Sequence, residues 1–194
     1  TAPLEHIVTW SAIGPDRGRF RLLGSACMER DIPQFGPRIS TETLRRFWIM
    51  LAHIRGGLLN AAALARGLGV DGKTIAKYLG SMVDLLLVRR LPPWQRNVGK
   101  RLVKSPKVDV CDIGVARALL GLGTKEEVPG HPVVGRSCEA FVIENLLSVA
   151  PERTEASFYR ASGGAEIDLV LTLPGREPWS IEVKLSLAPR PGKG

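Results

Sequence analysis

The sequence lacks any long hydrophobic run, and no stretch approaches the roughly 20 apolar residues that span a bilayer. It also lacks a secretory signal pattern at its start, so we expect a cytoplasmic protein without a membrane partner. Cysteine is scarce: the chain has 3, an odd number without metal-type spacing, at Cys27, Cys111 and Cys138. We therefore expect free thiols in a reducing compartment.

Histidine is just as scarce, with 3 residues spread far apart, at His6, His53 and His131. Isolated histidines are more often satisfied polar residues than ligands, so we assign these three no role. The sequence also lacks zinc-site spacing and a nucleophile elbow. It begins without Met and ends in PRPGKG, from which we expect a fragment of a longer protein.

Acidic residues are missing from one long basic stretch. From Leu85 to Val108 there are seven Lys or Arg and no Asp or Glu, and residues 1–97 hold 14 basic against 7 acidic residues. Such a run is either a solvated surface, a contact with an acidic domain, or a phosphate-binding stripe, and we favour the last. The predicted nucleic-acid contacts, with DNA as partner, are Lys73, Lys77, Arg89, Arg90, Lys100, Arg101, Lys104 and Lys107.

Residues 40–112 predict a winged helix-turn-helix, whereas residues 1–39 show weak periodicity and remain unassigned. Ser40 or Thr41, then Asn60, then Asp71 can each cap a helix. The third helix has an apolar stripe of Ile75, Tyr78, Leu79, Met82 and Leu86. Two short strands, KRLVK (100–104) and KVDVC (107–111), would then form the β-ribbon. The third helix would read DNA through Lys73 and Lys77, although such folds also bind proteins.

One motif in this region is misleading. GLGVDGKT, residues 67–74, satisfies the P-loop pattern, which requires a buried strand before it and a helix after it. The preceding segment is rich in alanine and predicts a helix instead. We therefore expect a turn between two helices here, and no nucleotide binding by this chain.

Residues 113–194 predict a helix followed by three strands. The helix begins near Gly135, and the residues expected near one face are Cys138, Phe141, Val142, Asn145 and Leu146. The strands are 157–160, 166–171 and 179–185, with turns at Gly163–Gly164 and Pro174–Gly175. The fold class is therefore α+β to α/β.

Two of these strands place charged residues together. Asp168 in EIDLVL, and Glu182 and Lys184 in IEVK, would emerge on one face of a hairpin. Two carboxylates and an ammonium in one place are costly without a metal or phosphate. The alternative is a surface Asp beside a Glu–Lys salt bridge.

This αβββ order, with EIDLVL and IEVK, resembles the front half of the PD-(D/E)xK nuclease core, truncated at its C-terminus. The resemblance implies Mg²⁺ on Asp168 and Glu182, with the Val183 carbonyl as a third ligand. Lys184 would orient the attacking water or stabilise the transition state. Glu139 on the preceding helix would add an acidic group, with Glu144 as the competing choice.

The resemblance leaves two functions open, and whether the chain is an enzyme is not decided. The first is a magnesium-dependent DNA phosphodiesterase that uses these four residues. The second is a DNA- or protein-binding module whose nuclease-like part is a catalytically idle scaffold.

A wider resemblance covers residues 29–187. RDIP (30–33), LLN (58–60), the stretch 91–121, EIDLVL and IEVK follow one another as they do in one family. The succession resembles the C-terminal region, a domain of unknown function (DUF4143), of a family of prokaryotic AAA-type ATPases. The resemblance implies an N-terminal ATPase domain in the parent chain as a partner, and it leaves homo-oligomerisation open.

Overall fold

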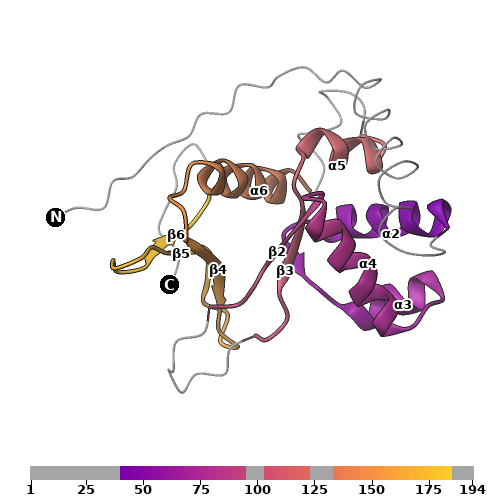
Figure 1. The fold of residues 1–194 in the computed structure, drawn as a ribbon, viewed down its shortest axis with the longest axis horizontal. Coiled ribbons are helices and arrows are strands. Elements are labelled where there is room, and N and C mark those ends of the chain that lie inside the picture. The colour runs from indigo at the N-terminus through magenta and orange to yellow at the C-terminus, as the bar shows by residue number, and fades with distance from the viewer. Residues whose placement is uncertain (1–39, 95–102, 123–132, 185–194) are drawn as a thin grey trace.

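The computed structural model describes residues 40–94, 103–122 and 133–184. Within these ranges the protein is a mixed α+β structure of five helices and two small antiparallel sheets (Figure 1). The helices are α2 (Thr41–Ile54), α3 (Ala61–Leu68), α4 (Gly72–Asp84), α5 (Ile113–Leu119) and α6 (Val133–Ser148). The strands are β1 (Gly57–Leu58), β2 (Val88–Leu91), β3 (Lys107–Val110), β4 (Glu155–Arg160), β5 (Glu166–Thr172) and β6 (Trp179–Ile181).

The first three helices begin at the capping residues that the sequence predicts. Ser40 Oγ accepts a hydrogen bond from the Thr43 amide at 3.0 Å. The side chain of Asn60 caps α3, and Asp71 Oδ1 caps α4 by accepting from the Thr74 amide at 2.6 Å. Each cap satisfies an amide that the first helical turn leaves without a partner.

The P-loop-like string lies across the turn between α3 and α4, as predicted. Gly69 ends α3 with φ 68°, a left-handed conformation that glycine adopts without strain. Gly72 then begins α4, two residues after Val70. A helix rather than a strand precedes the string, so the backbone does not have the strand-loop-helix form of a nucleotide-binding loop.

The first core lies among α2, α3, α4, α5 and the strands β2 and β3. Its largest fully buried members on α2 and α4 include Phe47, Trp48, Ile75 and Met82. Ala116 of α5 is also fully buried in this core, although the sequence assigns residues from 113 onward to the second segment. We call α2 to α5 with the sheet β1-β3-β2 the helical part.

The predicted stripe of the third helix is wrong at its last member. α4 ends at Asp84, and Leu86 lies beyond it with φ 57° and 78% of its surface exposed. The chain reverses at this point, and the Leu87 amide bonds back to the Met82 carbonyl. Leu86 therefore points away from the core that Met82 enters.

The strand pairing of the helical part differs from the predicted β-ribbon. β3 pairs antiparallel with β2, and also with the two residues of β1. Of the expected strand 100–104, the described residues Val103 and Lys104 are not in a strand, and the others lie outside the described residues. The register places Val88 opposite Val110, so that both enter the first core, which pairing with KRLVK does not achieve.

The C-terminal part consists of α6 and the sheet β4-β5-β6, with turns where the sequence predicts them. Phe158, Leu169 and Leu171 of the sheet pack with Ile143 of α6 in a second core. Leu91 of β2 joins this core, while Val88 of the same strand belongs to the first. Residues three apart on a strand face opposite sides, so β2 is shared by the two parts.

Candidate functional site

The alternation of side chains along β3 directs two charged residues toward the C-terminal part. Val108 and Val110 face the helical core, so Lys107 and Asp109 point to the opposite side of the strand. Arg89 lies opposite Asp109 in the register, and therefore on the same face. We call the contact between this face of β2 and β3 and the elements α6 and β5 the seam.

Three carboxylates surround the Lys107 ammonium at the seam. Its Nζ lies 2.9 Å from Glu139 Oε1, 2.9 Å from Glu166 Oε1 and 3.5 Å from Asp168 Oδ1. The ring centre of Phe158 lies 5.5 Å from the same Nζ atom. Lys107 is only 5% exposed, so its charge depends on these partners. We call Glu139, Glu166 and Asp168 the carboxylate cluster.

The electrostatics of the cluster keep the lysine charged. Burial lowers the pKa of Lys107, but the attraction and hydrogen bonds of Glu139 and Glu166 outweigh it and raise the pKa above its usual value. Burial raises the pKa of Glu139, Lys107 opposes this, and the nearby charge of Asp168 raises it further. The cluster therefore holds more negative charge than its single buried lysine neutralises.

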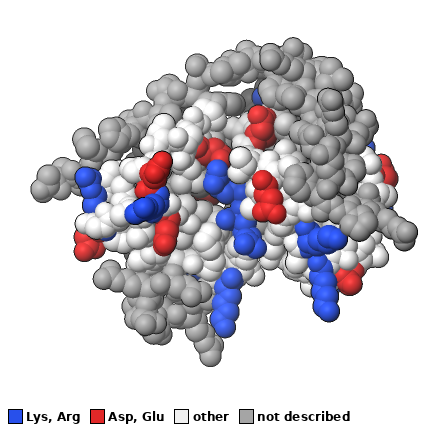
Figure 2. Space-filling model, in the orientation of Figure 1, with Lys and Arg blue, Asp and Glu red and all other residues white. Residues whose placement is uncertain are grey.

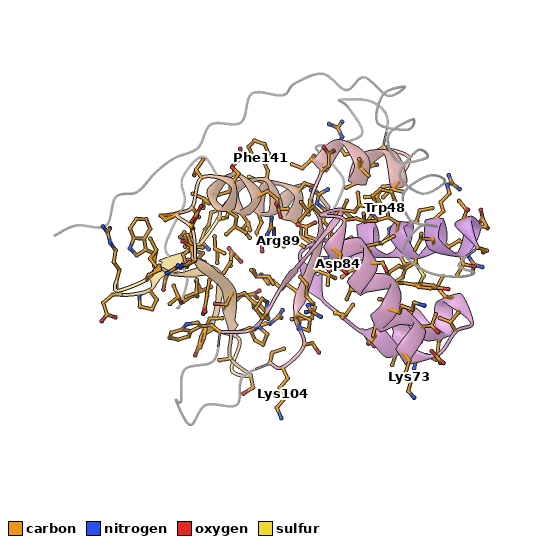
Figure 3. All side chains as sticks on the ribbon, viewed as in Figure 1. Trp48, Lys73, Asp84, Arg89, Lys104 and Phe141 are labelled. Atoms are coloured by element: carbon orange, nitrogen blue, oxygen red, sulfur yellow. The ribbon has the colours of Figure 1, made fainter. Side chains whose placement is uncertain are left out.

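Helix α6 brings two glutamates to the seam, on a face that the sequence did not indicate. Ala140 and Ile143 are its buried residues, and Asn145 of the predicted face is exposed. Figure 3 shows Phe141, another predicted inner residue, on the side of α6 away from the seam. The inner face of α6 is not purely apolar, because Glu139 and Glu144 lie beside its apolar residues. Hydrophobic periodicity therefore does not identify this face from the sequence.

The two glutamates of α6 have different partners. Glu139 belongs to the carboxylate cluster, where it shares Lys107 with Asp168. Glu144, the competing choice, binds Arg89 of β2 through two hydrogen bonds. The second of these joins Arg89 Nη2 to Glu144 Oε2 at 2.7 Å. Such a two-pronged guanidinium–carboxylate pair fixes the orientation of both side chains.

A second buried charge pair lies behind the seam. Arg55 is fully buried, and its Nε lies 3.3 Å from Asp109 Oδ1 without hydrogen-bond geometry. Burial raises the pKa of Asp109 to about 7, the charge of Arg55 opposes this, and the charge of Glu144 adds to it. Burial also lowers the pKa of Arg55. This pair is therefore a costly feature of the interior, because its polar atoms are incompletely satisfied.

The second strand of the predicted hairpin does not extend to two of the predicted catalytic residues. β6 ends at Ile181, so Glu182 and Lys184 follow the strand instead of lying in it. The Lys184 ammonium lies 2.6 Å from Glu182 Oε1, and both side chains are about a third exposed. Asp168 Oδ2 accepts a hydrogen bond from the Val183 amide at 2.9 Å. Asp168 and Glu139 share Lys107, whereas Glu182 and Lys184 form the salt bridge that the sequence offered as an alternative.

The residues as arranged do not fit a magnesium ion. Divalent metals need several carboxylate oxygens at about 2.0–2.6 Å around one point. In the carboxylate cluster that point is taken by Lys107 Nζ. Within the described ranges, no group of three or more His, Cys, Asp or Glu has the geometry to hold a metal ion.

The predicted nucleic-acid contacts fall into three groups. Lys73, Lys77, Arg90 and Lys104 are exposed. Arg89 is bound to Glu144 and Lys107 to the carboxylate cluster, so neither of these two offers a free charge to a phosphate in this conformation. Lys100 and Arg101 lie outside the described residues. Figure 3 shows Lys73 and Lys104 extending from the same side of the protein.

Charge is divided unevenly between the two parts. Residues 40–94 hold 8 Lys or Arg against 3 Asp or Glu, whereas residues 133–184 hold 5 against 8. On the face in Figure 2, acidic and basic side chains alternate over the middle, and long basic side chains extend from the lower edge. The first range therefore carries net positive charge and the second net negative charge.

Sequence reasoning missed Glu166 and the position of Lys107. Glu166 and Asp168 are two residues apart on β5, which places them on the same face of the strand. Lys107 alternates with the two valines of β3 in the same way. Both alternations can be read from the sequence, but the pairing of β3 with β2, which places Lys107 at the seam, cannot.

None of the helices in the described ranges is long and apolar enough to cross a membrane.

The described residues thus form a mixed α+β protein whose two parts meet around a buried lysine and three carboxylates. A family model for a domain of unknown function (DUF8612) matches residues 14–126, more than half of the chain, and the chain belongs to this family. A second model, for a domain of unknown function (DUF4143), matches residues 134–193 and confirms that part of the predicted resemblance. The stretch 91–121, on which the resemblance also depended, lies in the DUF8612 match.

Two curated proteins are similar to this chain. They are the uncharacterized proteins Rv2008c of Mycobacterium tuberculosis and Mb2031c of Mycobacterium bovis. Each is 41% identical over 163 residues, which cover 84% of this chain and 36% of the relative. The chain therefore spans about a third of the length of the relatives it matches.

Proposed function

We propose that this chain is a DNA-binding module without catalytic activity of its own. The observation that carries this proposal is the placement of charge. The exposed lysines of α4 lie on the basic helical part, whereas the nuclease-like residues lie on an acidic part where their charges are already paired. DNA binding is favoured on the basic helical part, whereas cleavage would require DNA to approach the acidic part.

The helical part supports a winged-helix interpretation. α3 and α4 are joined by a tight turn at Gly69, and an antiparallel sheet of β1, β3 and β2 packs on the helices. In the proposal, α4 enters the major groove and presents Lys73 and Lys77, which are four residues apart and therefore neighbours on one helical face. Lys104 then contacts the phosphates beside the groove.

The C-terminal part supports an idle nuclease-like scaffold. Its order of α6, β4, β5 and β6 is compatible with the proposed αβββ core, and Glu139 and Asp168 both contact Lys107. They converge on an ammonium, however, and Asp168 uses its other oxygen to hold the Val183 amide. The scaffold in this proposal orients the helical part and takes no part in cleavage.

The magnesium-dependent phosphodiesterase remains the second candidate, because Glu139 and Asp168 do lie together. It requires Lys107 to leave the carboxylate cluster, so that Asp168 and Glu182 can take up a metal. The relatives are much longer than this chain. We propose that the parent protein carries the ATPase domain that the resemblance implies, and that domain is what would move Lys107.

The two candidates separate in one assay. The chain is mixed with supercoiled plasmid and Mg²⁺ or Mn²⁺, and both retardation and nicking are measured. The proposed module retards the plasmid without nicking it. Nicking that disappears in Asp168→Asn and in Lys184→Ala would establish the phosphodiesterase instead. The absence of retardation at low salt would contradict both.

A further inference from the structure

The seam contains an arrangement that a simple salt bridge does not explain. One lysine, 5% exposed, serves three carboxylates from two different elements, α6 and β5. Arg160 adds a second cation only at the edge, 3.6 Å from Glu166 and 41% exposed. Three acids and two bases leave the cluster with excess negative charge.

We infer that Lys107 is a built-in cation, which fills the carboxylate cluster in place of a divalent metal ion and thereby joins the two parts of the protein. The lysine comes from β3 of the helical part, and its three ligands come from the C-terminal part. Occupation of the cluster by Lys107 and occupation by a metal are then mutually exclusive.

The geometry supports this substitution. Two of the oxygens, from Glu139 and Glu166, lie 2.9 Å from the nitrogen, which suits hydrogen bonds from an ammonium, and Asp168 adds an ion pair at 3.5 Å. A metal at the same point would need the oxygens to move inward to about 2.0–2.6 Å. Once the lysine is removed, the long side chains of Glu139 on α6 and Glu166 on β5 can move their carboxylates inward to such distances.

Removing the lysine should therefore create a metal site that the wild-type chain does not have. Lys107→Ala leaves three carboxylates facing a cavity without a cation, which destabilises the fold through uncompensated charge. A divalent ion added to this variant would restore the lost charge balance, and its binding energy would appear as folding stability. The experiment that tests this inference contains no nucleic acid, so its outcome does not depend on the DNA-binding proposal.

The experiment compares four proteins, each as the chain of residues 1–194. They are the wild type, Lys107→Ala, the double variant Lys107→Ala with Asp168→Asn, and the control Lys104→Ala, which removes an exposed lysine three residues away. Mn²⁺ binding is followed by the electron paramagnetic resonance signal of the free ion. Thermal unfolding is followed with and without Mn²⁺.

We expect saturable Mn²⁺ binding and a metal-dependent rise in Tm only in Lys107→Ala. The double variant should lose at least about tenfold in Mn²⁺ affinity, because it lacks one ligand carboxylate. If Lys107→Ala does not fold alone, Mn²⁺ should refold it. Mn²⁺ binding by the wild type as tight as by the variant would overturn the inference. So would a Lys107→Ala protein that neither binds Mn²⁺ nor is stabilised or refolded by it.

Discussion

Lys107 and Glu139 are 32 residues apart in sequence, yet Lys107 Nζ donates a hydrogen bond to Glu139 Oε1 at 2.9 Å across the seam. The contact joins a strand of the helical part to α6, which begins the C-terminal part. Residues from two matched family models therefore meet in one buried ion pair.

Glu139→Gln should leave the protein at least as stable as the wild type near pH 8, because burial and the charge of Asp168 raise the pKa of Glu139, so the fold favours its uncharged form. Urea unfolding of both proteins measures this difference. The control is Glu152→Gln, which changes an exposed glutamate after α6. A clearly lower unfolding midpoint for Glu139→Gln than for Glu152→Gln would contradict this prediction, because it would mean that the ionised carboxylate stabilises the seam.

Arg89 and Arg90 are adjacent but should have different roles. Arg89 is held by Glu144 at the seam, whereas Arg90 is exposed. Arg89→Ala should cost about 1 kcal/mol of stability, because the pair is partly solvent-screened, and the cost should be absent when Glu144 is already replaced. Arg90→Ala should leave stability unchanged and weaken DNA binding. A double-mutant cycle without coupling between Arg89 and Glu144 would contradict this assignment.

Stability should fall as the pH rises from about 4 to about 7, because Asp109 is held protonated in the folded state. Its pKa is raised to about 7 by burial, against Arg55, with Glu144 and Glu139 adding to the effect. In this window the folded protein keeps a proton that the unfolded chain has lost, so each rise in pH favours unfolding. The pKa of Glu139 is also raised and acts in the same direction.

Asp109→Asn tests that pH dependence, since the amide does not titrate. Tm is measured from pH 4.5 to pH 8 for both proteins. The variant should show a flatter decline, with the residual slope due to Glu139. An unchanged slope in Asp109→Asn would mean that another group carries the effect.

The chain should not bind Mg-ATP, although GLGVDGKT matches the P-loop pattern. The string begins in α3 and ends in α4, so its amides cap helices instead of surrounding a phosphate. Calorimetric titration should show no saturable heat. Micromolar binding that disappears in Lys73→Ala would contradict the observed helix-turn-helix geometry.

The sequence predicted the local structure of the helical part well, because capping residues and apolar spacing act over a few residues. Ser40, Asn60 and Asp71 each begin the helix expected of them. The strand pairing was harder to predict from the sequence, because β3 pairs with β2 and β1, which are distant from it in the chain. The predicted ribbon paired residues 107–111 with residues 100–104, which are nearer in the chain than β2 or β1.

The candidate site was predicted in part for the same reason. The resemblance implied Glu139 beside Asp168, with Glu144 as the competing choice, and in the structure Glu139 and Asp168 both contact Lys107. The arrival of Lys107 between them depends on how the two parts pack, which no local pattern in KVDV specifies. Glu182 and Lys184 were placed on a strand that ends at Ile181, one residue before the first of them and three before the second. Their mutual pairing is a contact between neighbours, and it was foreseen only as the alternative.

DNA binding through α4 is the central claim, and its salt dependence tests it most directly. Fluorescence anisotropy of a labelled duplex is measured against salt for the wild type and for Lys73→Ala with Lys77→Ala. The control, Arg153→Asn with Arg176→Ala, removes two exposed charges from the C-terminal part, with Asn chosen because Arg153 has φ 65°. The account predicts weaker binding and a log–log salt slope lower by about 2 for the lysine variant alone. Wild-type binding that both variants share unchanged would contradict it.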